Sequence, residues 1–372
     1  MDVTSEVRPK VLFVYPVEKG FPFWDSQVDY ASAVSEALGF ELEVAYAPKE
    51  YRNRFAALSF IKERVASSKK KPNLLITSFW LGSEFDILTY LEEQKIYGIS
   101  INSDISQEQY ARLGRPREQF TYWLASLSPN DTLAGKQLAE AILSHVKTKN
   151  CPLVSCEINV FAITGLRYSA VSIQRATGLH EALANEPQSK LLNLVYGKWD
   201  RQVVRGMTEA IIQRHDKIDA FWVASDVMAY GIFDRLNELG IELDPATVVG
   251  GIDWSPYSVE LIENGTMTMS LGGHFLEGGW AITLFFDYLN GRDFEQETGS
   301  VIKTSMSLLN ANNVKEVGQF LSNPQWSPEQ LRAYSKFLNP KRVKYNMDPQ
   351  LIISDQINAL KNAKLNWGHE PQ

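Results

Sequence analysis

Short apolar runs alternate with segments of helical periodicity along the first hundred residues. Apolar runs, or charged and apolar residues in alternation, predict strands over 11–15, 41–46, 74–76 and 97–101. Apolar residues that recur every three to four positions predict helices over 24–38, 52–66 and 84–94. Strands and helices in this alternation are typical of a parallel, doubly wound sheet.

The same alternation starts again near residue 159. The expected strands are 159–163, 191–195, 220–223, 248–252 and 268–271. The expected helices are 169–185, 201–214, 226–239, 256–264 and 278–289. Two such units in tandem predict an α/β protein with two lobes. After about residue 310 the alternation stops, and short helices are expected over 314–322, 327–337 and 349–363.

Composition narrows the class of protein. The chain has 372 residues and a formal charge of −7, with 44% hydrophobic and 22% charged residues, which is the balance of a well-packed globular protein. No apolar run reaches the roughly 18 residues that a membrane span needs. The acidic balance argues against bulk nucleic-acid binding. The first ten residues lack the apolar core of a signal peptide, so the protein is either cytosolic or exported with its signal removed.

Sequence motifs of the common enzyme classes are missing. The chain has no phosphate-binding GxxxxGK[ST], no HExxH and no GxSxG, and no GxGxxG follows the first strand. We therefore expect no catalytic residue, no cofactor and no metal. Cys151 and Cys156 lack further ligands for a zinc site, and they are either two thiols at a strand edge or a short-loop disulfide.

Aromatic and polar side chains follow the expected strands at their carboxyl ends, the edge at which open α/β sheets bind ligands. Rings pack against the C–H faces of a sugar, and carboxylates, amides and hydroxyls match its hydroxyl groups. The candidates are Phe23, Trp24, Trp80, Asn102, Trp199, Ser225, Asp253 and His274.

Structural alternatives exist for several of these residues. A tryptophan after a strand more often packs in a core or hinge than binds a ligand. Asp226 is expected to cap the helix that it precedes, whereas Asp253 is not needed as a cap because Ser255 and Pro256 are better placed to begin the next helix. Arg175 either bonds a ligand hydroxyl or pairs with a surface carboxylate. His274 contacts ligand, lines the wall of a cleft or is a satisfied interior histidine.

Four segments, taken in order, resemble a known family over residues 10–305. They are Phe21-Pro-Phe-Trp24, Lys198-Trp-Asp-Arg201, Ser225-Asp-Val-Met-Ala-Tyr-Gly231 and Val249-Gly-Gly-Ile-Asp-Trp-Ser255. The chain thereby resembles the type I periplasmic sugar-binding proteins, the ribose- and galactose-binding group, whose fold is shared with the effector domains of LacI-type repressors. The resemblance implies a solute-binding protein with a sugar-like ligand.

The resemblance also implies residue roles. Phe23, Trp24 and Trp199 would lie on the sugar faces, and Asp253 and Ser225 on its hydroxyls. Asn102 stands where the ribose group has an aspartate. The polar edge departs from the family pattern at other positions, since Phe21, Ser103, Ile173 and Gly273 replace polar family residues, with Arg175 and His274 nearby. The ligand would then be another pentose, a hexose, a disaccharide or a modified sugar rather than ribose.

In this family the two lobes close on the ligand, and the closed form is read by a membrane partner, either an ABC permease or a sensor. The resemblance implies three crossings between lobes, near 126–128, 272–274 and 302–304. Residues 1–127 with 274–303 would form one lobe, 128–273 with 304–320 the other, and 321–372 a helical extension. We expect a monomeric, periplasmic protein. The alternatives are an enzyme on the same scaffold, or a LacI-like regulator, for which no DNA-binding segment fits before residue 11.

Overall fold

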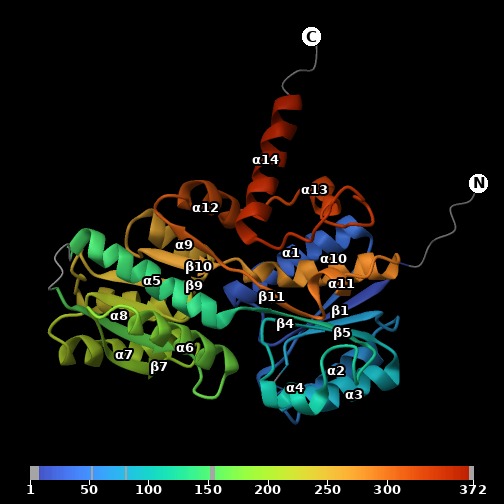
Figure 1. Ribbon diagram of the computed structural model, residues 1–372, viewed down its shortest axis with the longest axis horizontal. Coiled ribbons are helices and arrows are strands. Elements are labelled where there is room, and N and C mark those ends of the chain that lie inside the picture. The colour runs from blue at the N-terminus through green and yellow to red at the C-terminus, as the bar shows by residue number, and fades with distance from the viewer. Residues whose placement is uncertain (1–7, 52, 80–81, 151–155, 368–372) are drawn as a thin grey trace, which may run out of the picture. The chain divides into compact units, whose positions relative to one another are not determined.

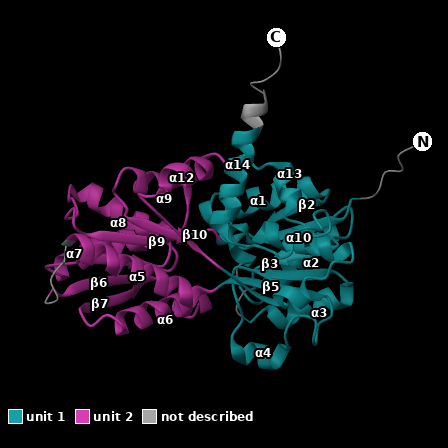
Figure 2. Ribbon diagram, turned by 45° about the horizontal axis from the view of Figure 1, so that its top comes forward, with its two compact units in different colours: residues 1–129, 274–304, 325–372 teal, residues 130–273, 305–324 magenta. Residues whose placement is uncertain are grey.

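The computed structural model describes residues 8–51, 53–79, 82–150 and 156–367 (Figure 1). The chain divides into two compact units, coloured separately in Figure 2. Unit 1 comprises Met1–Pro129, His274–Thr304 and Gln325–Gln372, and unit 2 comprises Asn130–Gly273 and Ser305–Pro324. The chain therefore changes units four times rather than three, because the tail from Gln325 onward belongs to unit 1 and is not a separate extension.

Unit 1 is built on a six-stranded, all-parallel sheet of order β11-β5-β4-β3-β1-β2. Its strands are β1 (Lys10–Tyr15), β2 (Glu41–Tyr46), β3 (Leu74–Thr77), β4 (Tyr97–Ile101), β5 (Trp123–Pro129) and β11 (Val301–Thr304). Its helices are α1 (Pro22–Leu38), η1 (Lys49–Tyr51), α2 (Ala57–Ser67), α3 (Glu84–Gln94), α4 (Gln107–Leu113), η2 (His274–Leu276), α10 (Glu277–Leu289), α11 (Glu295–Thr298), α13 (Pro328–Ala333) and α14 (Pro349–Trp367).

Unit 2 repeats the architecture with the sheet order β12-β10-β9-β8-β6-β7, in which only β12 is antiparallel. Its strands are β6 (Ile158–Thr164), β7 (Ser189–Tyr196), β8 (Ala220–Val223), β9 (Val248–Asp253), β10 (Met269–Gly272) and β12 (Ser307–Asn310). Its helices are α5 (Asp131–Asn150), α6 (Ala170–Ala184), α7 (Arg201–Arg214), α8 (Asp226–Leu239), α9 (Pro256–Glu263) and α12 (Val314–Ser322).

The predicted α/β class with two doubly wound lobes is confirmed. Strands β1, β3 and β8 are buried over their whole lengths, as continuous apolar runs in parallel sheets require. Helices α1 and α8 end at Gly39 and Gly240, each with a positive φ that a glycine adopts without strain. Along the described residues, every helix is too short or too polar to cross a lipid bilayer.

Helix α5 is not among the predicted elements, although Leu138, Ile142 and Val146 recur on one face and are buried. It packs on α6 at close range, because a Cβ at Gly135 or Gly178 would overlap the backbone of the other helix. This contact fixes the start of α5 beside the first half of α6, where two charged residues of the candidate site lie.

The tail is anchored to helix α10. Asp287 of α10 is fully buried, and its carboxylate accepts hydrogen bonds from the Lys336 amide (2.7 Å), the Ser335 hydroxyl and the Tyr345 hydroxyl (2.7 Å). The tail helix predicted over 327–337 is shorter than expected, since α13 ends at Ala333 and the chain turns to reach Asp287.

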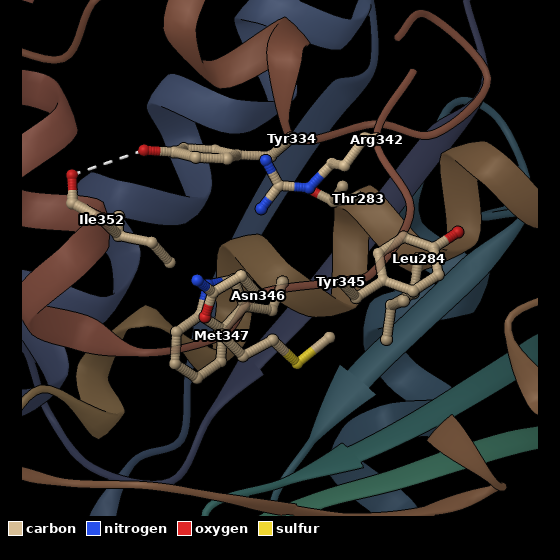
Figure 3. A pocket seen from close by; sticks show the side chains of 9 residues that line it. Thr283, Leu284, Tyr334, Arg342, Tyr345, Asn346, Met347 and Ile352 are labelled. Atoms are coloured by element: carbon tan, nitrogen blue, oxygen red, sulfur yellow. Dashed lines mark hydrogen bonds between the residues drawn. The ribbon is translucent and has the colours of Figure 1, made fainter. Parts of the chain in front are cut away.

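A small pocket lies where the tail covers α10. Figure 3 shows Thr283 and Leu284 of α10 opposite Tyr334, Arg342, Tyr345, Asn346, Met347 and Ile352 of the tail. The Tyr334 hydroxyl donates to the carbonyl oxygen of Ile352 at 3.3 Å across it (Figure 3). None of the lining residues follows a strand, so this pocket is separate from the strand-end residues that the sequence points to.

Candidate functional site

Unusual backbone conformations gather at the carboxyl ends of the strands. Seven non-glycine residues of the described chain have a positive φ, and five of them end or follow a strand: Asn102, Lys198, Trp199, Asp253 and Trp254. Such conformations are sparsely populated for residues with a side chain, and they persist where the surrounding structure enforces them. Three of the five are residues that the sequence predicts to bind ligand.

Aromatic rings form one group in unit 1, around the start of α1. The ring of Trp24 lies edge-on to those of Phe23 (5.2 Å between centroids) and Tyr15 (5.6 Å). On its other side, Phe23 packs against the imidazole of His274 at 4.4 Å. The Tyr15 hydroxyl donates to Asp25 (2.8 Å), and burial together with that carboxylate raises the pKa of Tyr15. The fold thus brings together three predicted residues, Phe23, Trp24 and His274.

His274 is only 1% exposed, as the interior alternative for this residue requires. Phe23 and Trp24 are half-buried. Of the two rings, Phe23 is the one that contacts the buried imidazole. A ligand stacked on the opposite face of Phe23 would therefore be separated from His274 by that ring. Direct contact between His274 and a ligand stays a prediction.

Polar side chains from strands β5 and β11, and from the loop that follows β4, form a second group in unit 1. Asp104 accepts hydrogen bonds from the hydroxyl of Tyr110 (2.7 Å) and the ammonium of Lys303 (2.6 Å). Lys303 also donates to the Ser128 hydroxyl at 3.1 Å. Half-buried Asn102 lies at the start of this loop with a φ of 67°. Asp104 belongs to the Asn102-Ser103-Asp104 run that follows β4 in the strand-end pattern, whereas Lys303 was not singled out from the sequence.

In unit 2, the indole of Trp199 lies directly on Gly165. A Cβ at Gly165 would overlap the indole ring, so only glycine leaves room for it after β6. Trp199 is half-buried, and the guanidinium of Arg175 lies 5.9 Å from its ring centroid, within the range of a cation–π contact. The indole of Trp199, which is predicted to lie on a sugar face, therefore packs against Gly165 and beside the guanidinium of Arg175.

Arg175 is 3% exposed and is directed at protein groups. Its Nε donates to Asp131 at 2.7 Å and its Nη1 donates to the carbonyl of Ala224 at 2.6 Å. Its Nη1 also lies 3.9 Å from Asp253. The alternative of a surface carboxylate partner is wrong, because Asp131 at the start of α5 is itself buried. Hydrogen bonding to a ligand stays a prediction.

Asp253 ends strand β9 with a φ of 137° and keeps part of its side chain exposed. Burial raises the pKa of Asp253, Arg175 opposes the rise, and the neighbouring carboxylate of Asp226 adds to it. A hydrogen bond from Ser225 favours the charged form. As expected, Ser255 and Pro256 begin the next helix, so Asp253 is not its cap.

Asp226 is not the helix cap that the sequence predicts. Ser225 occupies the cap position of α8, and the buried Asp226 carboxylate instead accepts hydrogen bonds from Ser258 (2.7 Å) and Ser270 (2.9 Å). It also accepts the backbone N–H of Ser255 at 3.1 Å. Burial raises the pKa of Asp226, and the serine hydrogen bonds act against that rise. Asp226 thus holds the β9–α9 turn that presents Asp253.

Comparison with known proteins identifies the family. A family model described as a periplasmic binding protein domain matches residues 11–293. The chain belongs to the periplasmic binding protein family. Galactofuranose-binding protein YtfQ of Escherichia coli K12 is 22% identical over 152 residues, which are 40% of this chain and 46% of that relative. The chain thus matches about half the length of this curated relative.

Solved structures share the fold of this periplasmic binding protein. A periplasmic sugar-binding protein from Pseudomonas fluorescens has a TM-score of 0.77 at 24% identity, covering 92% of this chain and 99% of that one. An ABC transporter periplasmic solute-binding protein from Actinobacillus succinogenes, with bound D-allose, has a TM-score of 0.70 at 17% identity, covering 83% and 99%. At these identities, the likeness establishes the fold alone.

Two predictions for this periplasmic binding protein fall outside the part of the chain that the structure describes. Trp80 and Cys151 lie outside the described residues, so neither the ring at Trp80 nor the pairing of Cys151 with Cys156 is tested. Trp254, the aromatic residue next to Asp253, is buried and donates its indole N–H to the carbonyl of Ser270 at 3.1 Å, which is core packing. Within the described chain, no group of three or more His, Cys, Asp or Glu side chains is arranged to hold a metal ion.

Gly165→Ala is expected to displace the Trp199 indole, because the added methyl group would occupy the same space. If Trp199 packs on the ligand, affinity should fall by about 1–2 kcal/mol, as measured by calorimetry. Gly206→Ala is a matched control in the same unit, since nothing lies within 4 Å of a Cβ there. Unchanged affinity in Gly165→Ala, with the control also unchanged, would contradict the placement of Trp199 at the ligand.

Proposed function

We propose that the protein is an exported solute-binding protein that binds a sugar or sugar-like ligand and closes on it. The aromatic and polar residues of unit 1 and those of unit 2 would each supply half of the binding site. Ligand contacts to both halves at once would stabilise the closed form, and the free energy of binding would shift the equilibrium between open and closed forms.

The observation that carries this proposal is the chemistry of the strand ends. In unit 1 the rings of Phe23 and Trp24 lie together, and Asn102 follows a strand with a positive φ. In unit 2 Arg175 lies beside the ring of Trp199 and 3.9 Å from Asp253. The nearby cations Arg175 and Lys303 are each matched to a carboxylate. This combination of flat apolar surfaces and neutralised charge suits an uncharged polyhydroxylated ligand.

Similar proteins narrow the candidate ligands. One curated relative is named for galactofuranose, and solved structures of the same fold hold D-allose, α-D-tagatopyranose, myo-inositol or L-arabinofuranose. Several of these structures are components of ABC transporters. By analogy, the protein would act in the periplasm and present its ligand to an ABC permease or a membrane sensor, without chemical change to the ligand.

The test is a thermal-shift screen against these sugars, with other pentoses, hexoses and disaccharides. A ligand that binds only the folded state at 100 times its Kd adds about 2.7 kcal/mol to the free energy of unfolding, which raises Tm. We expect one sugar to raise Tm in the wild type and much less in Trp199→Ala. A panel without any shift would contradict a sugar ligand, and chemical conversion of the recovered sugar would contradict pure binding.

A further inference from the structure

We infer that Glu277 is a positioning residue for the ligand-binding turn of unit 1, acting on Asn102. The inference rests on the proposed function, because it assigns Asn102 to the ligand. Glu277 is the first residue of helix α10, where the helix dipole favours a carboxylate, and it is 0% exposed. Charged groups are rarely buried to this extent unless they are bonded to specific partners.

The contacts of Glu277 join three segments that are distant in sequence. Oε2 accepts the backbone N–H of Asn102 at 2.7 Å, and Oε1 accepts the hydroxyl of Thr304 at 2.6 Å. Asn102 follows β4, Thr304 ends β11, and Glu277 begins α10. The short, charge-assisted bond to Asn102 holds a backbone that has a φ of 67°, which a non-glycine residue rarely keeps unaided.

The geometry has a direct consequence for the side chain of Asn102. A turn that relaxes toward negative φ would rotate the Cα–Cβ bond and move the amide away from its present direction. Glu277 would therefore set where Asn102 points without contacting the ligand. Unit 2 has a parallel arrangement, in which buried Asp226 accepts the backbone N–H of Ser255, two residues after Asp253. In each unit, a buried carboxylate anchors the turn that carries a candidate ligand-binding side chain.

Glu277→Gln tests this role with almost no change in shape. The glutamine carbonyl can serve only one of the two donors, so the bond to Asn102 is weakened or lost. In ligand-free protein, the Asn102 amide should exchange with solvent about tenfold faster than in wild type, by loss of one charged hydrogen bond. Affinity for the sugar found in the screen should also fall about tenfold.

A double-variant cycle separates positioning from general destabilisation. Asn102→Gly removes the side chain at a φ that glycine tolerates, so adding Glu277→Gln to it should cost no further affinity. Asp287→Asn is the matched control, since Asp287 is equally buried on the same helix but bonds the tail. This control should lower Tm and leave both Asn102 exchange and sugar affinity unchanged.

The outcomes are distinct. Unchanged exchange at Asn102 in Glu277→Gln would overturn the inference, whether or not any sugar binds. Additive losses of affinity in the double variant would overturn it as well, because Glu277 would then act independently of Asn102. A wild-type protein that binds no sugar, while exchange at Asn102 still responds to Glu277→Gln, would instead contradict the proposed function and leave the anchoring of the turn supported.

Discussion

Arg175→Met is expected to lower the free energy of unfolding by about 3–5 kcal/mol, the usual cost of breaking a buried ion pair from one side. The substitution keeps most of the aliphatic length and removes the guanidinium charge from buried Asp131, as well as the donor to the Ala224 carbonyl. It also removes the cation beside Asp253. Denaturant unfolding followed by circular dichroism measures the change.

Two further variants make this result specific. Arg175→Met combined with Asp131→Leu removes both charges, and it should recover part of the lost stability because no uncompensated carboxylate stays buried there. Arg235→Met is the surface control: Arg235 pairs with Glu209 and Glu238 at the edge of α8, and solvent screens such pairs. If Arg175→Met were no more destabilising than Arg235→Met, the Arg175–Asp131 pair would have no structural importance.

Local periodicity was sufficient to predict most of the fold. Helices α3, α7 and α8 begin and end at the predicted residues, because apolar spacing and terminal signals are properties of neighbouring positions. Strand β12 was not predicted, since its sequence SLLN forms neither a continuous apolar run, as in β8, nor an alternation of polar and apolar residues. Helix α5 was overlooked despite a clear apolar face, which is an error of interpretation and not a limit of the sequence.

The sequence could predict the strand-end residues of the candidate site, but not the residues that hold them in place. Strand ends are visible in the sequence, so Trp199 and Asp253 could be selected from position and chemistry. The groups that hold them could not, because their partners are far apart in the chain. Arg175 and Asp131 are separated by 44 residues, and Asn102 and Glu277 by 175. Which charged residue meets which is decided by tertiary packing, and the close α5–α6 contact through Gly135 and Gly178 is one example.

The role of the buried acid Asp226 was predicted wrongly from the sequence. Asp226 precedes a helix, and from its neighbours alone a cap was the simplest interpretation. The structure instead surrounds its carboxylate with hydroxyls from Ser255, Ser258 and Ser270, which come from two later segments. Several small donors around one carboxylate form only when those segments fold together, so no local pattern distinguishes this role from capping.

Sugar affinity is expected to strengthen as pH rises through the raised pKa of Asp253, above the value of about 4 at which an ordinary aspartate titrates, and to level off once Asp253 is fully ionised. The reason is that the carboxylate accepts hydrogen bonds from sugar hydroxyls more strongly than the neutral acid. Burial and Asp226 raise the pKa of Asp253, so its titration lies above the usual range of an aspartate. Below that pKa Asp253 is protonated, so sugar affinity falls as pH is lowered.

Asp253→Asn should remove this pH dependence and weaken binding by about 1.5–3 kcal/mol, the loss of a hydrogen bond to a charged group. Asparagine has almost the same size and shape as aspartate, so the turn itself should persist. Asp216→Asn, an exposed position of the same unit, is the control and should keep the wild-type profile. Titration calorimetry between pH 4.5 and 8.5 compares the three proteins, with the range set around the ordinary and raised aspartate values. If the sugar affinity of the wild type did not change with pH, Asp253 would not be a ligand contact. A carboxylate that accepts hydrogen bonds from the sugar must bind it less tightly once it is protonated.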